Sequence, residues 1–129
     1  SAPCLFCRIV ARESAAQIEY EDDEVLAFRD IYPKAPVHLL VVPKRHIDSV
    51  MRLSDADAGL VGRLVLVARR LGEARGLGER GYRLAINCGP EGGQEIYHLH
   101  LHFLAGRLQE RKVGDAVGVK GALRQSPPE

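Results

Sequence analysis

The sequence predicts a single α+β domain in which two helices accompany five short strands. Three observations point to this fold class. The chain has 129 residues, which is enough for one ordinary domain but too few for two that each bury a core. Apolar residues recur at helical spacing in two segments, and they alternate or run together in five short ones. Glycine and proline, which interrupt regular structure, lie between several of these segments.

The first half of the chain contains the shorter predicted helix and three of the strands. The helix runs from Pro3 to about Glu13, where apolar residues recur at helical spacing. An acidic turn separates the first two strands, and Pro36 and Pro43 bound the third. These strands are Ile18–Glu21, Val25–Phe28 and His38–Val42.

The second half contains the long predicted helix and two further strands. Ser54 and Asp57 resemble a capping box, and the helical pattern continues to about Arg75. The two strands are Tyr82–Asn87 and His100–Ala105. We expect residues 1–106 to form the domain and residues 107–129, which are polar with scattered glycine, to form a C-terminal tail.

Two apolar stripes along the long helix predict a homodimer. One consists of Val61, Leu64, Val65, Ala68 and Leu71, and the other of Leu60, Val67 and Ala74. The sheet can cover only one stripe. We therefore expect a second copy of the chain to cover the other.

The composition excludes several classes of function. With 18 Lys+Arg against 17 Asp+Glu, the net charge of +1 gives no electrostatic basis for a nucleic-acid or membrane partner. No apolar run approaches the roughly 18 to 20 residues that a membrane-spanning helix needs. The three cysteines do not form a disulfide framework, and the sequence shown has no secretory signal. These features are typical of a cytoplasmic protein.

The most informative motif is His98-Leu99-His100-Leu101-His102-Phe103, in which three histidines alternate with apolar residues. On a strand, this alternation places the three imidazoles on one face, with about 6.6 Å between neighbours, and the apolar side chains in the core. Imidazole can act as nucleophile, general base or metal ligand near neutral pH. Incidental histidines on a solvated strand are the alternative interpretation.

A glycine-rich segment, Asn87 to Gln94, lies directly before the histidines. Such a segment can turn backbone N–H groups toward an anion. A turn between two strands also needs glycine and proline for conformational reasons alone. No Walker-type lysine follows, which argues against a P-loop nucleotide hydrolase.

Cys4 and Cys7 form a Cys-x-x-Cys pair near the start of the chain. Together with His46 and one histidine of the alternating motif, they would complete the Cys₂His₂ ligand set of a closed structural zinc site. A thioredoxin-like redox pair and two unconnected thiols are the alternatives.

Taken together, these motifs resemble the histidine triad (HIT) family, and most closely its Hint branch of nucleoside phosphoramidases. The resemblance extends from about Cys4 to Gly106. It rests on Leu26-Ala27-Phe28-Arg29-Asp30-Ile31, Pro33-x-Ala35-Pro36-x-His38, Val42-Pro43-Lys44-x-His46-Ile47, Asn87, Gly92-Gly93-Gln94 and Tyr97-His98-x-His100-x-His102. It implies an α+β fold with a five-stranded antiparallel sheet and two helices, paired into a homodimer.

The resemblance also implies catalytic roles for four histidines. His100 would attack the α-phosphorus of a nucleotide and form a nucleotidyl-histidine, which water then hydrolyses. His102 would contact the phosphate, and His38 would support the triad from an adjacent strand. His98 would hold structural zinc together with Cys4, Cys7 and His46, and so brace the strand that presents His100. Catalysis itself would need no cofactor.

The family's nucleotide site maps onto ten residues. Asp30 would bind the ribose hydroxyls, with a turn or cap role as its alternative. Apolar residues would surround the base, although each could simply pack in the core. The apolar set is Leu5, Phe6, Ile9, Phe28 and Ile31, and the residues expected near the phosphate are Asn87, Gly93, Gln94 and Glu95.

The chain departs from the Hint pattern in two places. Glu95 stands where that branch commonly has a serine near the phosphate and leaving group. Its charge would repel phosphate unless it turns away or recruits a cationic leaving group. The chain also lacks the tryptophan-containing ending that some members have, and that region influences substrate choice in the family.

The resemblance implies an enzyme that releases a purine nucleoside monophosphate from a 5′-phosphoramidate or an aminoacyl-adenylate-like compound. Two alternatives remain open within nucleotide chemistry: a dinucleoside polyphosphate hydrolase, and a nucleotide-binding partner protein with weak catalysis. A third is a zinc hydrolase in which the alternating histidines surround an open metal position.

Overall fold

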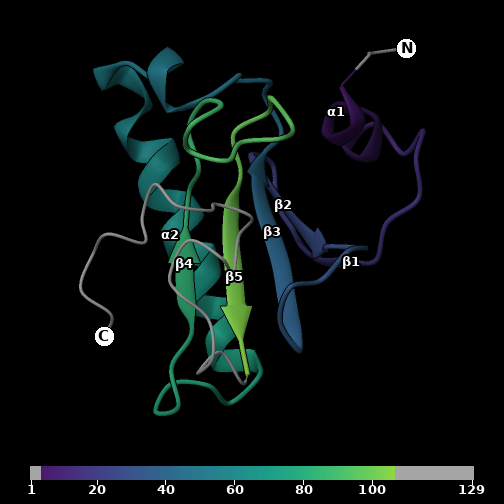
Figure 1. Ribbon diagram of the computed structural model, residues 1–129, viewed down its shortest axis with the longest axis vertical. Helices are drawn as coiled ribbons and strands as arrows, with labels where there is room; N and C mark the ends of the chain where they lie inside the picture. Colours follow the sequence, from purple (N-terminus) through teal and green to yellow (C-terminus); the bar gives the residue numbers. More distant parts are fainter. Residues whose placement is uncertain (1–3, 107–129) are drawn as a thin grey trace.

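The computed structural model describes residues 4–106, where two α-helices accompany one five-stranded sheet (Figure 1). The strand order is β1-β2-β3-β5-β4, and every neighbouring pair is antiparallel. The elements are α1 (Leu5–Val10), β1 (Ile18–Glu21), β2 (Val25–Arg29), β3 (Val37–Pro43), α2 (Ala58–Ala74), β4 (Arg83–Ala85) and β5 (Leu101–Ala105), with short 3₁₀ helices at Val50–Arg52 and Asp55–Asp57. The predicted fold class is confirmed, and the expected tail at 107–129 lies outside the described residues.

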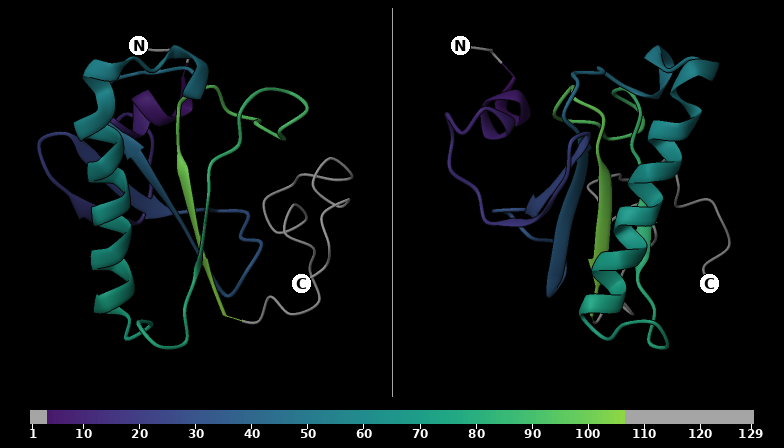
Figure 2. Two further views of the ribbon diagram at one scale, coloured as in Figure 1. Left: turned by 90° about the vertical axis from the view of Figure 1, so that its left-hand side faces the viewer. Right: turned by 180° about the vertical axis from the view of Figure 1, so that it is seen from behind.

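Helix α2 packs along one face of the sheet (Figure 2). It follows the capping box of Ser54 and Asp57, as the sequence predicts. The assignment of its two stripes is wrong, however. Val67 is fully buried against the sheet with Leu64, whereas Val65 and Leu66 are 45% and 53% exposed. Leu64, Val67 and Leu71 follow one another at intervals of three and four residues, so they form a single face.

The opposite face of the sheet is covered in part by α1, a helix of six residues that is shorter than predicted. Phe6 and Ile9 of this helix pack on strand side chains that point away from α2. Along each strand, these side chains alternate with the ones that face α2. These side chains are Leu26 and Phe28 of β2 and Leu40 and Val42 of β3. Figure 1 shows α1 at the same end of the sheet as the loop that precedes β5.

Strand β5 begins at Leu101, one residue later than predicted, so His100 precedes it as His98 does. The backbone N–H of Leu99 donates to the carbonyl oxygen of Ile47, at 2.6 Å, instead of joining the β-ladder. The alternation persists nevertheless. Leu99 and Phe103 lie in the core under α2, and the His98 and His100 rings contact Phe6 on the other face.

Strand β4 is also shorter than the predicted Tyr82–Asn87 and forms one edge of the sheet. Within residues 4–106, no helix combines the length and apolar character that crossing a membrane requires.

Candidate functional site

One cavity lies between α1, the end of β2 and the loop before β5, and it collects most of the predicted site residues. Its apolar lining includes Leu5, Phe6, Ile9, Ala16, Phe28, Ile31, Leu40 and Ile96. Its polar lining includes Asp30, Lys34, His38, Asn87, Gly93, Glu95, His100 and His102. Gln94 and His98 are the two residues predicted at the nucleotide or catalytic site that do not line it.

The ring of His100 is held in one tautomer by a hydrogen bond to the main chain. Its Nδ1–H donates to the carbonyl oxygen of His98 at 2.7 Å. Since a carbonyl can only accept, Nδ1 carries the hydrogen, and Nε2 of the neutral ring carries a lone pair. Nδ1 is occupied by the backbone, so Nε2 is the nitrogen left for the cavity. The ring of Phe6 stands edge-on to that of His100, with centroids 5.2 Å apart.

His38 and His102 form a hydrogen-bonded pair that selects the opposite tautomer. The backbone N–H of Lys34 donates to Nδ1 of His38 at 3.0 Å, so the hydrogen of His38 is on Nε2. That Nε2–H donates to Nδ1 of His102 at 2.9 Å. Consequently His102 carries its own hydrogen on Nε2. The cavity thus receives a lone pair from one histidine and an N–H donor from another.

The histidines that line the cavity are stabilised in the neutral form. Burial lowers the pKa of His38 and of His100 below the ordinary value. For His102, burial and the neighbouring charges of His100, His38 and Lys34 lower the pKa to about 3. A neutral imidazole is the form that can act as a nucleophile.

Asp30 lies at the end of β2 with its carboxylate in the cavity. Its Oδ1 accepts the backbone N–H of Tyr32 at 2.8 Å, and its Oδ2 is 3.5 Å from Nε2 of His38. The turn role that the sequence offered as an alternative is therefore present. The hydrogen bond of the turn uses only Oδ1, and Asp30 still lines the cavity.

Three backbone amides of the glycine-rich loop are used within the loop itself. The amides of Gly92, Gly93 and Gln94 donate to carbonyl oxygens within the loop. The tight turn requires glycine, because a Cβ at position 92 would lie 2.3 Å from the carbonyl oxygen of Cys88, and Gly93 has a φ of 83°. Of the two interpretations that the sequence left open, the self-contained turn accounts for these three amides.

The side chain of Gln94 is buried and fastens this loop to neighbouring segments. Its Oε1 accepts the backbone N–H of Gly89 at 3.0 Å. Its Nε2 donates to the carbonyl oxygens of Asp48 and Ile96 at 2.8 and 3.1 Å. The glutamine thus fixes the position of the loop that carries Glu95. The amide nitrogen of Asn87 donates to the carbonyl oxygen of Gly93 at 3.4 Å, so it also contacts the loop.

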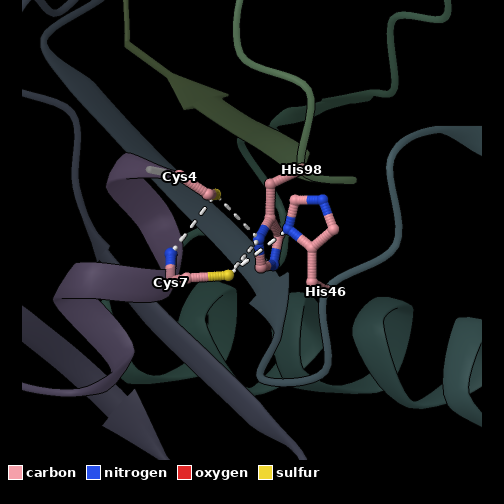
Figure 3. Close-up of side chains that lie close together, drawn as sticks. All are labelled: Cys4, Cys7, His46 and His98. Carbon is pink, nitrogen blue, oxygen red and sulfur yellow. Dashed lines mark hydrogen bonds between the residues drawn. The ribbon is translucent and has the colours of Figure 1, made fainter. Parts of the chain in front are cut away.

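Figure 3 shows that the side chains of Cys4, Cys7, His46 and His98 converge. Their four ligand atoms lie within 4.8 Å of one another. Nδ1 of His98 is 3.3 Å from Sγ of Cys4 and 3.6 Å from Sγ of Cys7. Nδ1 of His46 is 3.3 Å from Sγ of Cys7. Burial and the nearby Cys4 raise the pKa of the Cys7 thiol to about 11 in the absence of a metal.

This cluster fits tetrahedral zinc on two independent grounds. Zinc–sulfur bonds of about 2.3 Å and zinc–nitrogen bonds of about 2.0 Å place sulfur and nitrogen ligands about 3.5 Å apart. Both histidines also use Nε2 elsewhere and leave Nδ1 for a metal. Nε2 of His98 donates to the carbonyl oxygen of Pro43 at 2.8 Å, and Nε2 of His46 donates to Asp48 at 2.6 Å.

Several residues of the site were not expected from the sequence. Asp48, two residues after His46, was a detectable signal, since metal-binding histidines commonly pair with a carboxylate. Pro43 and Lys34 support the histidines through main-chain atoms, which every residue type has, so the sequence does not reveal these contacts. Ala16 and Ile96 line the cavity from loops whose path the sequence pattern does not predict.

Comparison with known proteins assigns the chain to a family. Over residues 3–118 it matches the family described as "Scavenger mRNA decapping enzyme C-term binding". It is 45% identical over 103 residues to the purine nucleoside phosphoramidase of Escherichia coli, covering 80% of this chain and 87% of that protein. The chain belongs to the histidine triad (HIT) family.

Solved structures of histidine triad proteins also match the fold of this chain. A HIT family hydrolase from Legionella pneumophila matches with a TM-score of 0.80 at 48% identity, covering 82% of this chain and 95% of that one. A zinc-bound histidine triad family protein from Mycobacterium smegmatis matches with a TM-score of 0.72 at 33% identity, covering 81% and 76% respectively.

Proposed function

We propose that the protein, a nucleotide hydrolase of the HIT family, cleaves purine nucleoside 5′-phosphoramidates or aminoacyl-adenylate-like compounds to the nucleoside monophosphate. The observation that carries the proposal is the pair of opposite tautomers in one cavity. His100 contributes a lone pair on Nε2, and His102 contributes an N–H. The 45% identity to a purine nucleoside phosphoramidase supports the choice of substrate class.

The reaction proceeds in two steps. Nε2 of His100 attacks the α-phosphorus, a phosphorus–nitrogen bond forms, and the bond to the leaving group breaks as that group departs with its electron pair and takes up a proton. Water then attacks phosphorus and releases the monophosphate, and His100 is regenerated. The N–H of His102 stabilises the negative charge that develops on the phosphoryl oxygens.

The nucleoside is held at the apolar end of the same cavity. Phe6 and Ile9 of α1 face Phe28 of β2 there, and an apolar slot accepts the faces of a purine. The carboxylate of Asp30 accepts hydrogen bonds from the ribose hydroxyls. Gly93 and Asn87 border the phosphate end.

A catalytic metal held by the alternating histidines has less support. Nε2 of His38 and Nδ1 of His102 lie 2.9 Å apart, a distance typical of a hydrogen bond. His98 turns toward the cysteines instead of the cavity.

For the metal, we propose structural zinc held by Cys4, Cys7, His46 and His98. Zinc there supplies bonds that fasten α1 to the segment before β5, and it takes no part in the bond changes. The zinc-bound relative supports this choice. Since α1 contributes Phe6 and Ile9 to the cavity, the metal also helps to keep the nucleoside site in shape.

For the assembly, we propose a homodimer formed through the outward face of α2. Val65 and Leu66 are large apolar side chains exposed on that face, and β4 is an edge strand of the sheet. For the compartment, we propose the cytoplasm, in keeping with three free cysteines.

Replacing the nucleophile tests the proposed reaction. His100→Ala is expected to reduce AMP release from an adenosine 5′-phosphoramidate by at least about 10³-fold, because no other group forms the covalent intermediate. AMP binding, measured by calorimetry, should persist. Brief chelation should leave the wild-type rate unchanged. Wild-type protein that binds AMP without releasing it from this substrate would contradict the proposal.

Removing the metal tests the zinc site. Prolonged chelation should lower the thermal midpoint of the wild type by about 5 °C or more, since a ligand at 100 times its dissociation constant stabilises by about 2.7 kcal/mol. AMP should then bind more weakly. In the matched variant Cys7→Ser, the chelator should cause no further shift. A wild type that contains no zinc and is indifferent to chelation would exclude the site.

A charge placed on the outward face of α2 tests the dimer. Sedimentation equilibrium should give the wild type twice the chain mass of 14.2 kDa. Leu66→Asp should give the mass of one chain, because a carboxylate cannot be buried there without a partner. A wild type that sediments as a single chain would disprove the assembly.

A further inference from the structure

Glu95 is a carboxylate of the cavity to which the proposed reaction assigns no partner. It lies in the loop before β5, is exposed, and lines the cavity close to Gly93 and Ile96. Asp30, the other carboxylate in the lining, accepts a hydrogen bond from Tyr32. Among residues 4–106, no hydrogen bond or ion pair involves the Glu95 carboxylate.

Lys34 and Arg29 are the cations of the lining, and neither forms an ion pair with Glu95 in the part of the chain that the structure describes. Lys34 acts on the ring of His102, where its charge helps to lower the pKa. Arg29 pairs with Glu19 at 2.7 Å, on the neighbouring strand β1. Within residues 4–106, the carboxylate of Glu95 therefore lines the cavity without an ion pair to either cation.

This charge lies within electrostatic reach of the nucleophile. Asp30, Glu95 and His100 all line the same cavity. A phosphate bound at His100 therefore lies near two carboxylates. Two like charges beside an anion are unfavourable unless the substrate brings a matching group to each of them.

In the proposed complex, the ribose hydroxyls of the substrate donate hydrogen bonds to Asp30. Glu95 lies on the loop before β5 and not on α1, whose Phe6 and Ile9 line the nucleoside end. The part of the substrate left to meet Glu95 is the group attached beyond phosphorus, which is the leaving group. A carboxylate at that position favours a cation.

We propose that Glu95 is a specificity-determining residue that selects leaving groups carrying a protonated amine, through an ion pair between its carboxylate and the ammonium group. This inference rests on the proposed phosphoramidase function. The ammonium stays protonated throughout. Only the phosphorus–nitrogen bond breaks, and the departing nitrogen takes up a proton while His100 gains the bond to phosphorus.

Two adenosine 5′-phosphoramidates of nearly equal shape test the inference. In one, the phosphorus-bound nitrogen carries a 2-aminoethyl group, which ends in an ammonium; in the other, it carries a propyl group. The ratio of their kcat/KM values should fall about threefold or more in Glu95→Gln, since an exposed ion pair contributes up to about 1 kcal/mol, or about fivefold. Comparing ratios between proteins cancels the intrinsic reactivity of the two substrates.

Glu91→Gln is the matched control, because it removes the same charge from an exposed residue of the same loop that does not line the cavity. Its ratio should equal that of the wild type. An equal ratio in wild type and Glu95→Gln would overturn the inference, and so would a drop of the same size in Glu91→Gln. If the wild type cleaves neither compound, the proposed function fails and this inference falls with it.

Discussion

The hydrogen bond from Nδ1 of His100 to the carbonyl oxygen of His98 is the interaction on which the site depends. It decides which nitrogen of His100 carries the lone pair, and it aims that nitrogen at the cavity. The carbonyl is itself held in place, because the His98 ring bonds to the carbonyl of Pro43 on one side and faces Cys4 on the other. In the proposed mechanism, the cysteine and histidine cluster therefore positions His100, the proposed nucleophile, without itself touching the substrate.

His38 and His102 form a second pair of histidines, and they lie on neighbouring strands of the sheet. His38 of β3 and His102 of β5 are diagonal neighbours, since Leu40 is directly opposite His102. The backbone N–H of Lys34 donates to His38, and His38 in turn donates to Nδ1 of His102. The hydrogen of His102 is therefore on Nε2. Burial keeps the pKa of both rings low, so the pair is neutral at physiological pH. One side of the sheet thus presents both a ring nitrogen with a lone pair and an N–H donor, which are the groups that the proposed reaction uses.

Much of this site could be predicted from residue types, because its chemistry resides in side chains. The alternation from His98 to Phe103 predicts the imidazole face, and the Cys-x-x-Cys pair predicts the cluster of cysteines and histidines. The amides of the glycine-rich loop could not be assigned, because the same composition serves an anion nest or a self-contained turn. The stripes of α2 were misassigned since Val65 and Val67 are equally apolar. Only packing decides which of them is buried.

The most direct test of the account is the protonation of the two cavity histidines, measured by nitrogen-15 NMR of histidine-labelled protein. At pH 7 we expect hydrogen on Nδ1 of His100 and on Nε2 of His102. His102 should still be neutral about one pH unit below the ordinary histidine pKa of about 6.5, because its own pKa is lowered to about 3. Hydrogen on Nε2 of His100, or a charged His102 under these conditions, would contradict the account.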